Sequence, residues 1–148
     1  MVTVKDLLNK LKGVNIKSLT ATVIKESEKE IIKVNQQELS QGRNFIGQTV
    51  GTYSKRTESI SKQTNPRRPK KAGQPYNFED TGELFDKMFL SLTGSILKIG
   101  SKGKGDKDKK LFVDQNDLLG FDKVSGEIIN TKIILPKLQK KFRAKTGL

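Results

Sequence analysis

The chain has 148 residues, and its 29 lysines and arginines against 16 aspartates and glutamates give a formal net charge of +13. It contains no histidine, cysteine or tryptophan. Disulfides, thiol chemistry, Cys/His zinc sites and Ser-His-Asp triads are therefore excluded. The length suits a single domain, 1–148, and the content of Leu, Ile, Val and Phe suits a modest hydrophobic core.

Apolar runs are short throughout the sequence. None approaches the roughly 18 consecutive apolar residues that indicate a transmembrane helix. The first residues, MVTVKDLLNKLKG, lack the apolar stretch and the cleavage site of a signal peptide. We therefore expect a protein that is made and kept in a cytosol and has no membrane partner.

Two helices are predicted at the start of the chain. Residues 2–12 carry apolar residues at helical spacing and end at Gly13. A longer helix is predicted over 18–40, with Gly42 suited to its C-terminal cap. Its apolar positions recur roughly on one stripe, namely Leu19, Val23, Ile24, Ile31, Val34 and Leu39.

The next segment has a different composition. Residues 42–75 hold eight lysines and arginines against one glutamate, and apolar residues are sparse. The stretch NPRRPKKAGQP, residues 65–75, contains three prolines, which disfavour helix. A long extended basic loop or arm is therefore predicted over 43–75.

A β-hairpin is predicted after this arm. Apolar and polar residues alternate on both sides of Gly94, which suits a tight turn. An exposed glycine- and lysine-rich loop is expected over 101–110, and a short strand and turn over 111–121.

A final helix is predicted over 126–145, with Ser125 as its cap. Pro136 should kink or split this helix near Leu135, and Gly147 should end it. The fold class is therefore α+β, a small antiparallel sheet packed by the long N-terminal helix and by this basic C-terminal helix.

Two patterns could carry enzyme chemistry, but simpler explanations account for both. The acidic residues of 79–86 could hold Mg²⁺ or serve in acid–base catalysis, although a short helix capped by Asp80 or Thr81 also explains them. The glycines of 100–105 lack the GxxxxGK[ST] pattern of a phosphate loop, so a solvated loop is expected. We predict no catalytic, cofactor-binding or metal-binding residue and no cofactor.

The cations are the strongest compositional signal. They could contact nucleic-acid phosphates or acidic surfaces of protein partners, or they could be merely solvated. The two tyrosines are too few for a base-stacking platform, so charge matching is expected. The candidate contact residues are Lys55, Arg56, Arg67, Arg68, Lys70, Lys71, Lys102 and Lys104.

A turn motif follows the basic segment. After Pro75 and a short spacer comes Asp-Thr-Gly-x-Leu, formed here by Asp80, Thr81, Gly82 and Leu84. With a long helix and a basic loop before it and a hairpin after it, this motif resembles the neck and tail-completion proteins of tailed bacteriophages. The motif residues are expected to be structural, because glycine permits the turn and the leucine enters the core. Asp-Thr-Gly also occurs in aspartic proteases, but those need two such motifs per active site, or a dimer.

The end of the chain resembles the same family, since Leu118-Leu119-Gly120-Phe121 precedes a basic helix that ends in Gly147-Leu148. The resemblance implies a non-enzymatic virion protein, assembled in the host cytoplasm. It would form a homo-oligomeric ring in the neck or tail-top, with neck, portal or tail proteins as partners and with possible contact to phage DNA. The alternative, based on charge, is a small basic protein that binds nucleic acid without sequence specificity.

Overall fold

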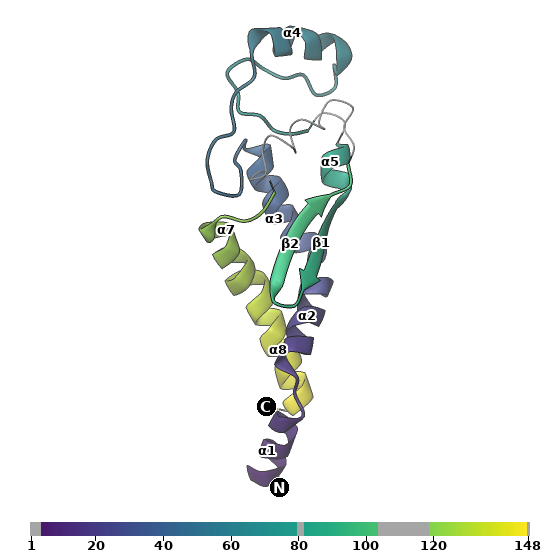
Figure 1. The fold of residues 1–148 in the computed structure, drawn as a ribbon, viewed down its shortest axis with the longest axis vertical. Coiled ribbons are helices and arrows are strands. Elements are labelled where there is room, and N and C mark those ends of the chain that lie inside the picture. The colour runs from purple at the N-terminus through teal and green to yellow at the C-terminus, as the bar shows by residue number, and fades with distance from the viewer. Residues whose placement is uncertain (1–3, 80–81, 104–118, 148) are drawn as a thin grey trace.

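The computed structural model describes residues 4–79, 82–103 and 119–147, and the molecule is elongated (Figure 1). Helix α1 (Val4–Lys12), predicted from the sequence, lies at the end that also holds the C-terminus. Helix α4 (Lys55–Thr64) lies at the opposite end. The fold is α+β, as predicted, with helices packed against an antiparallel sheet.

The predicted helix 18–40 is present as two helices, α2 (Ile16–Glu26) and α3 (Glu28–Ser40), which meet at Ser27. Ser27 is fully buried, with φ −97° and ψ 7°, yet its N–H still bonds to carbonyls of the preceding turn. Its hydroxyl accepts a hydrogen bond of 3.1 Å from Lys137 Nζ. The small side chain thus lets the C-terminal helix approach the point where the two helices meet.

One stripe of α2 and α3 forms the centre of the core. Its buried members are Leu19, Val23, Ile24, Ile31 and Leu39. Ile24 and Ile31 pack with Ile129 of the C-terminal helix, whereas Leu39 packs with Met88 of the sheet. The helix pair therefore connects the sheet to the C-terminal helix, as its predicted apolar stripe indicates.

The predicted hairpin is confirmed. Helix α5 (Glu83–Asp86) leads into strands β1 (Met88–Thr93) and β2 (Ile96–Ser101), which pair antiparallel. Gly94 has φ +63° in the turn between them, a backbone conformation that glycine adopts without strain.

The two faces of the hairpin differ. Leu90 pairs with Ile99, and both pack with Leu97 against the buried stripe of the helices. On the other face the Phe89 ring lies against Gly100, where a Cβ would be 2.8 Å from the ring's Cζ. Glycine is needed at that position because any side chain would displace the ring.

The C-terminal helix runs through α7 (Lys123–Ile128), the π-helix η1 (Ile129–Ile134) and α8 (Leu135–Thr146). The predicted cap is wrong. Asp122 is the N-cap, and its Oδ1 accepts a hydrogen bond of 2.6 Å from the backbone N–H of Ser125. Ser125 lies inside the first turn and is buried, so its hydroxyl contacts α3 instead of capping the helix.

Pro136 accounts for the change of helix type. Proline lacks an N–H, and its ring clashes with the carbonyl four residues earlier in a regular α-helix. The π-helix immediately before it is wider, and α-helix resumes at Leu135, where the sequence predicts an interruption. The helix ends at Gly147, with φ +73°, as predicted.

The basic segment 43–75 is not extended throughout, contrary to the prediction. Helix α4 forms within it and begins after Ser54, whose Oγ accepts a hydrogen bond of 3.1 Å from the N–H of Thr57. The proline-rich stretch 65–75 then returns as turns and extended chain. The helix has a single residue of the Leu, Ile, Val and Phe class, Ile60, so apolar periodicity could not reveal it.

Some predictions fall outside the described residues. The loop over 101–110 is described as far as Gly103, and the strand and turn over 111–121 from Leu119 onward. The motif residues Asp80 and Thr81 and the candidate contact residue Lys104 also lie outside.

Candidate functional site

The basic segment forms a folded projection at the end of the molecule opposite the two termini (Figure 1). We call residues 51–79 the basic projection. Its two legs pair with each other, since Thr52 bridges Pro75 and the N–H of Tyr53 donates to Gln74 O at 2.9 Å. The projection is therefore a closed loop and not a free arm.

Aromatic rings pack where the projection joins the body. The rings of Tyr53 and Tyr76 meet edge to face with centroids 4.9 Å apart, and Phe78 lies 6.4 Å from Tyr76. A Cβ on Gly51 would be 2.7 Å from Tyr76 Cε2, so glycine lets that ring lie against the backbone. Because both tyrosine rings pack here, neither forms an open platform for stacking a base.

Hydrogen bonds join α4 to the returning chain. Ser61 is buried, and its Oγ accepts a hydrogen bond of 2.8 Å from the N–H of Lys70. Glu58 Oε2 accepts one of 2.9 Å from the N–H of Ala72, and Glu58 Oε1 lies 2.7 Å from Lys62 Nζ. The hydrogen bond from Lys62, together with that from Ala72, lowers the pKa of Glu58 below its ordinary value.

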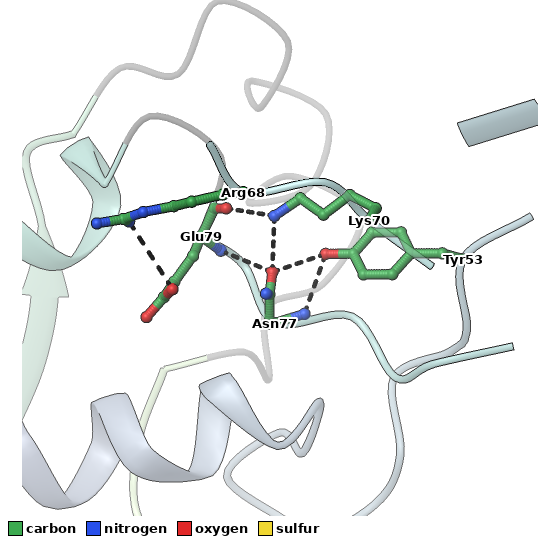
Figure 2. A network of polar contacts seen from close by, with 5 residues as sticks. All are labelled: Tyr53, Arg68, Lys70, Asn77 and Glu79. Carbon is green, nitrogen blue, oxygen red and sulfur yellow. Dashed lines mark hydrogen bonds and ion pairs between the residues drawn. The ribbon is translucent and has the colours of Figure 1, made fainter. Parts of the chain in front are cut away.

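Lys70 does not present its charge to the solvent, unlike the other candidate contact cations that the structure describes. It is 7% exposed, and Figure 2 shows its side chain turned toward Asn77 and Glu79. Its Nζ donates to Asn77 Oδ1 at 2.8 Å and to the Glu79 carbonyl, and it lies 5.5 Å from the centroid of the Tyr53 ring. The sequence-based assignment of Lys70 as a partner contact is thus wrong for this structure, because its ammonium group serves the internal packing.

Asn77 is the centre of this network (Figure 2). Its Oδ1 accepts hydrogen bonds from Lys70 Nζ, from Tyr53 Oη at 2.9 Å and from the N–H of Glu79 at 3.1 Å. Its own N–H donates to Tyr53 Oη at 3.0 Å. One amide side chain thereby fixes both legs of the projection.

Arg68 connects the projection to the turn motif. Its Nη1 lies 3.8 Å from Glu79 Oε2, and its side chain remains more than half exposed. The same nitrogen lies 3.9 Å from the position that a Cβ on Gly82 would take. Two regions that the sequence analysis treats separately are thus adjacent in space.

The structure brings most of the candidate cations together. Exposed on the basic projection are Lys55, Arg56, Arg67, Arg68 and Lys71. Lys102 is also exposed, but it follows β2, and its Nζ lies 5.6 Å from the centroid of the Phe89 ring. The projection is therefore the main cationic surface that the candidate residues form.

Gly82, the described glycine of the turn motif, lies at the start of α5. It is the N-cap of α5 with φ +86°, and its carbonyl accepts a hydrogen bond of 3.0 Å from the N–H of Phe85. The caps that the sequence predicts, Asp80 and Thr81, lie outside the described residues. Phe85 packs near Leu39 and Met88 of the core, whereas Leu84 is half-buried.

A second polar cluster, which the sequence analysis missed, joins α3 to the start of the C-terminal helix. Asn35 and Glu38 are 1% and 4% exposed. Asn35 Nδ2 donates to Gly120 O at 2.5 Å, and Ser125 Oγ donates to Glu38 Oε1. Asn35 and Glu38 follow Ile31 at helical spacing and so lie on the apolar stripe of the helix. Polar residues at such positions were the sequence signal that could have indicated a buried polar cluster.

The pKa values of the two carboxyl groups in this cluster shift in opposite directions. Loss of solvent raises the pKa of Glu38, and the nearby carboxylate of Asp122 raises it further. The pKa of Asp122 is lowered, chiefly by the hydrogen bond from the backbone N–H of Ser125. Glu38 Oε2 and Asn35 Oδ1 have no hydrogen-bond partner among the described residues. A proton on Glu38 therefore reduces the unfavourable burial of charge.

Residues 4–79, 82–103 and 119–147 contain no group of three or more Asp, Glu, His or Cys side chains placed to hold a metal ion. No helix within these ranges has both the length and the apolar content to cross a membrane. Comparisons of the chain with family models, curated proteins and solved structures gave no match.

Proposed function

We propose that this protein is a non-enzymatic structural protein of a tailed-bacteriophage virion. It forms a ring in the neck or tail-top that joins the portal-containing head to the tail. The order of elements carries the proposal, because a long helix pair, a basic projection, the Gly82 turn, a hairpin and a C-terminal helix follow one another as the resemblance requires. The protein is assembled in the host cytoplasm, and its partners are other neck, portal or tail proteins.

Two groups of exposed apolar side chains support assembly between copies. Leu8, Leu11 and Ile16, near the N-terminus, are 51%, 40% and 49% exposed. Leu92 and Ile96, beside the hairpin turn, are 37% and 61% exposed. Exposed apolar groups of this kind are typical of interaction surfaces. Because the two groups differ, they permit a heterologous contact, which closes into a ring when the rotation between copies allows it.

The hairpin group borders a concave surface. A groove of about 330 Å³ between α2 and the hairpin is lined by Ala21, Ile24, Leu90, Leu92 and Leu97 together with two charged residues of the helix pair. A contact at such a small surface is weak by itself. Repetition around a symmetry axis makes the assembly stable, because each copy is held by two neighbours.

The mass of the purified full chain in solution tests the proposal. Light scattering over a range of concentrations should give a mass that reaches an integer multiple of the chain mass and then stays constant, as expected of a closed ring. A chain that remains monomeric at high concentration would rule out a ring that forms without other virion components.

A double variant sharpens this experiment. Replacement of the exposed hairpin residues, Leu92→Ser with Ile96→Ser, should reduce the oligomer fraction by at least tenfold. The matched control replaces polar residues of the same hairpin, Ser91→Ala with Lys98→Ala, and should assemble as the unmodified chain does. Equal assembly of both variants would show that the hairpin is not in the interface.

The exposed cations favour one alternative function. A small basic protein that binds nucleic acid without sequence specificity would display the same projection. The two functions differ in oligomeric state, because the alternative predicts a DNA-binding monomer. The mass measurement therefore distinguishes them whether or not DNA binds.

A further inference from the structure

The basic projection carries a large excess of positive charge. Residues 51–79 contain seven lysines and arginines against two glutamates. Both glutamates already interact within the projection, Glu58 with Lys62 and Glu79 with Arg68. The remaining exposed cations form no ion pair among the described residues, and they are Lys55, Arg56, Arg67 and Lys71.

These cations are attached to a fixed scaffold. The buried network around Lys70 and Asn77 holds the two legs together, and Ser61 and Glu58 hold α4 to the returning chain. A partner that binds such a surface needs to immobilise only the ends of the side chains and not the backbone, which lowers the entropic cost of association.

The spacing of the cations suits a duplex. Lys55 and Arg56 begin α4, whereas Arg67 follows its C-terminal end. A helix of ten residues is about 15 Å long. The major groove of B-DNA is about 12 Å wide, so cations at the two ends of α4 can reach phosphates on both sides of one groove.

A second copy of this chain is a poor match for the projection. The acids in ion pairs with this chain's own cations are Glu26, Glu30, Glu58, Glu79 and Glu83. Glu28 accepts a hydrogen bond from the N–H of Leu90, while Glu38 and Asp122 belong to the buried cluster. The other described acids are Asp6, Asp86 and Glu127, on three different helices. The described surface of a sister copy thus lacks an acidic patch that could pair with the projection.

We infer that the basic projection docks on the phosphate backbone of duplex DNA, without reading base sequence. DNA offers one negative charge per about 1.7 Å of its axis, a density that the described part of this chain does not offer. Tyr53 and Tyr76 pack on each other, so the projection shows no stacking platform of the kind that favours single strands. The inference does not depend on the proposed ring, since either a ring or a monomer could present this surface.

The test measures the affinity of the full chain for a mixed-sequence DNA duplex of about 30 base pairs. Fluorescence anisotropy reports the binding at salt concentrations between about 50 and 200 mM. The affinity should fall steeply with salt. The variant Lys55→Ala, Arg56→Ala, Arg67→Ala, Lys71→Ala should reduce the slope of log affinity against log salt by about 3 to 4, or about 1 for each lost phosphate contact.

A matched control removes the same charge elsewhere. The variant Lys123→Ala, Lys132→Ala, Lys140→Ala, Lys145→Ala changes exposed residues of the C-terminal helix. It should keep the salt slope within about one unit of the unmodified chain. An equal loss in both variants would assign binding to net charge and overturn the inference.

Two further outcomes would also overturn it. The first is the absence of salt-dependent duplex binding by the unmodified chain. The second is stronger binding to poly-L-glutamate than to the duplex, which would indicate an acidic protein as the partner. Because light scattering measures the ring separately, failure of DNA binding and failure of ring formation are distinguishable.

Discussion

The body and the basic projection are stabilised by different kinds of interaction. In the body, Ile31 and Leu39 are fully buried among other apolar side chains. In the projection, the buried side chains are polar, namely Ser61 and Lys70 at 6% and 7% exposed. A segment poor in apolar residues can therefore hold a defined shape when each buried donor meets an acceptor. The contrast predicts that mutations in the body lower the stability of the whole fold, whereas mutations in the projection destabilise the projection alone.

The largest effect is expected in the body. Ile31→Ala should lower the free energy of unfolding by about 2–5 kcal/mol, because it removes buried apolar volume and leaves a cavity. Urea denaturation followed by circular dichroism measures the change. The exposed Ile60→Ala in α4 is the matched control and should change stability by less than about 1 kcal/mol. Similar losses in both variants would contradict the assignment of the core to the helix pair.

Asn77→Ala should have a strong effect that stays within the projection. It removes the acceptor of Lys70, Tyr53 and the backbone of Glu79, which should destabilise the closed projection by about 1–3 kcal/mol. Hydrogen exchange should quicken at the amides of Tyr53 and Ala72 and stay unchanged in α3.

The exposed Gln74→Ala, in the same leg, is the control and should leave those exchange rates unaltered. If Asn77→Ala also accelerated exchange throughout α3, the two regions would unfold as one unit, and the contrast between them would be lost.

Gly82→Ala tests the connection between the regions. Gly82 has φ +86°, a left-handed conformation that strains an alanine, so the variant should lower the free energy of unfolding by about 1–2 kcal/mol. Gly126→Ala, inside α7 and with open space around its Cβ position, should instead be neutral or slightly stabilising. Thermal melts of the two variants check the prediction, and equal melting temperatures would argue against a required left-handed turn.

The smallest effect concerns pH and the buried cluster of the body. Burial raises the pKa of Glu38 above its ordinary value of 4.5, so the folded state keeps a proton that the unfolded state loses. The stability that this group contributes should therefore fall as the pH rises from about 4.5 through the raised pKa. Urea midpoints of Glu38→Gln should lack this fall.

Asp122 should contribute the opposite slope. Its pKa is lowered from 3.8, so stability from this group is present above 3.8 and is lost as the pH falls through the lowered pKa. Asp122→Asn should remove the loss at acid pH and leave a smaller fall above 4.5, because burial still raises the pKa of Glu38 while the Asp122 carboxylate no longer does. Identical pH profiles for both variants would show that the two carboxyl groups do not titrate as assigned.

Local patterns predicted the elements that apolar periodicity defines. The stripe from Leu19 to Leu39, the hairpin around Gly94 and the change at Leu135 follow from residue spacing and from proline and glycine. The break at Ser27 did not follow, because no proline or glycine marks it in the sequence. The residue that bonds to its hydroxyl, Lys137, comes from a distant part of the chain.

The sequence predicted that the candidate site, the basic projection, is rich in lysine and arginine, but it did not predict how this segment folds. Helix α4 needs Ser61 and Glu58 to bond with the returning chain, and those contacts join residues that no helical or strand period relates. Lys70 likewise bonds to Asn77, seven residues later in the chain, and no regular helical or strand spacing relates the two residues. Sequence could identify the basic segment, whereas its shape required the folded molecule.

The most direct test of the proposed function is the position of the protein in purified phage particles. Electron microscopy of particles that carry a labelled copy should show the label as a ring at the junction of head and tail. Particles that contain no label at that junction, although the labelled protein is expressed and folded, would contradict a role in joining the two.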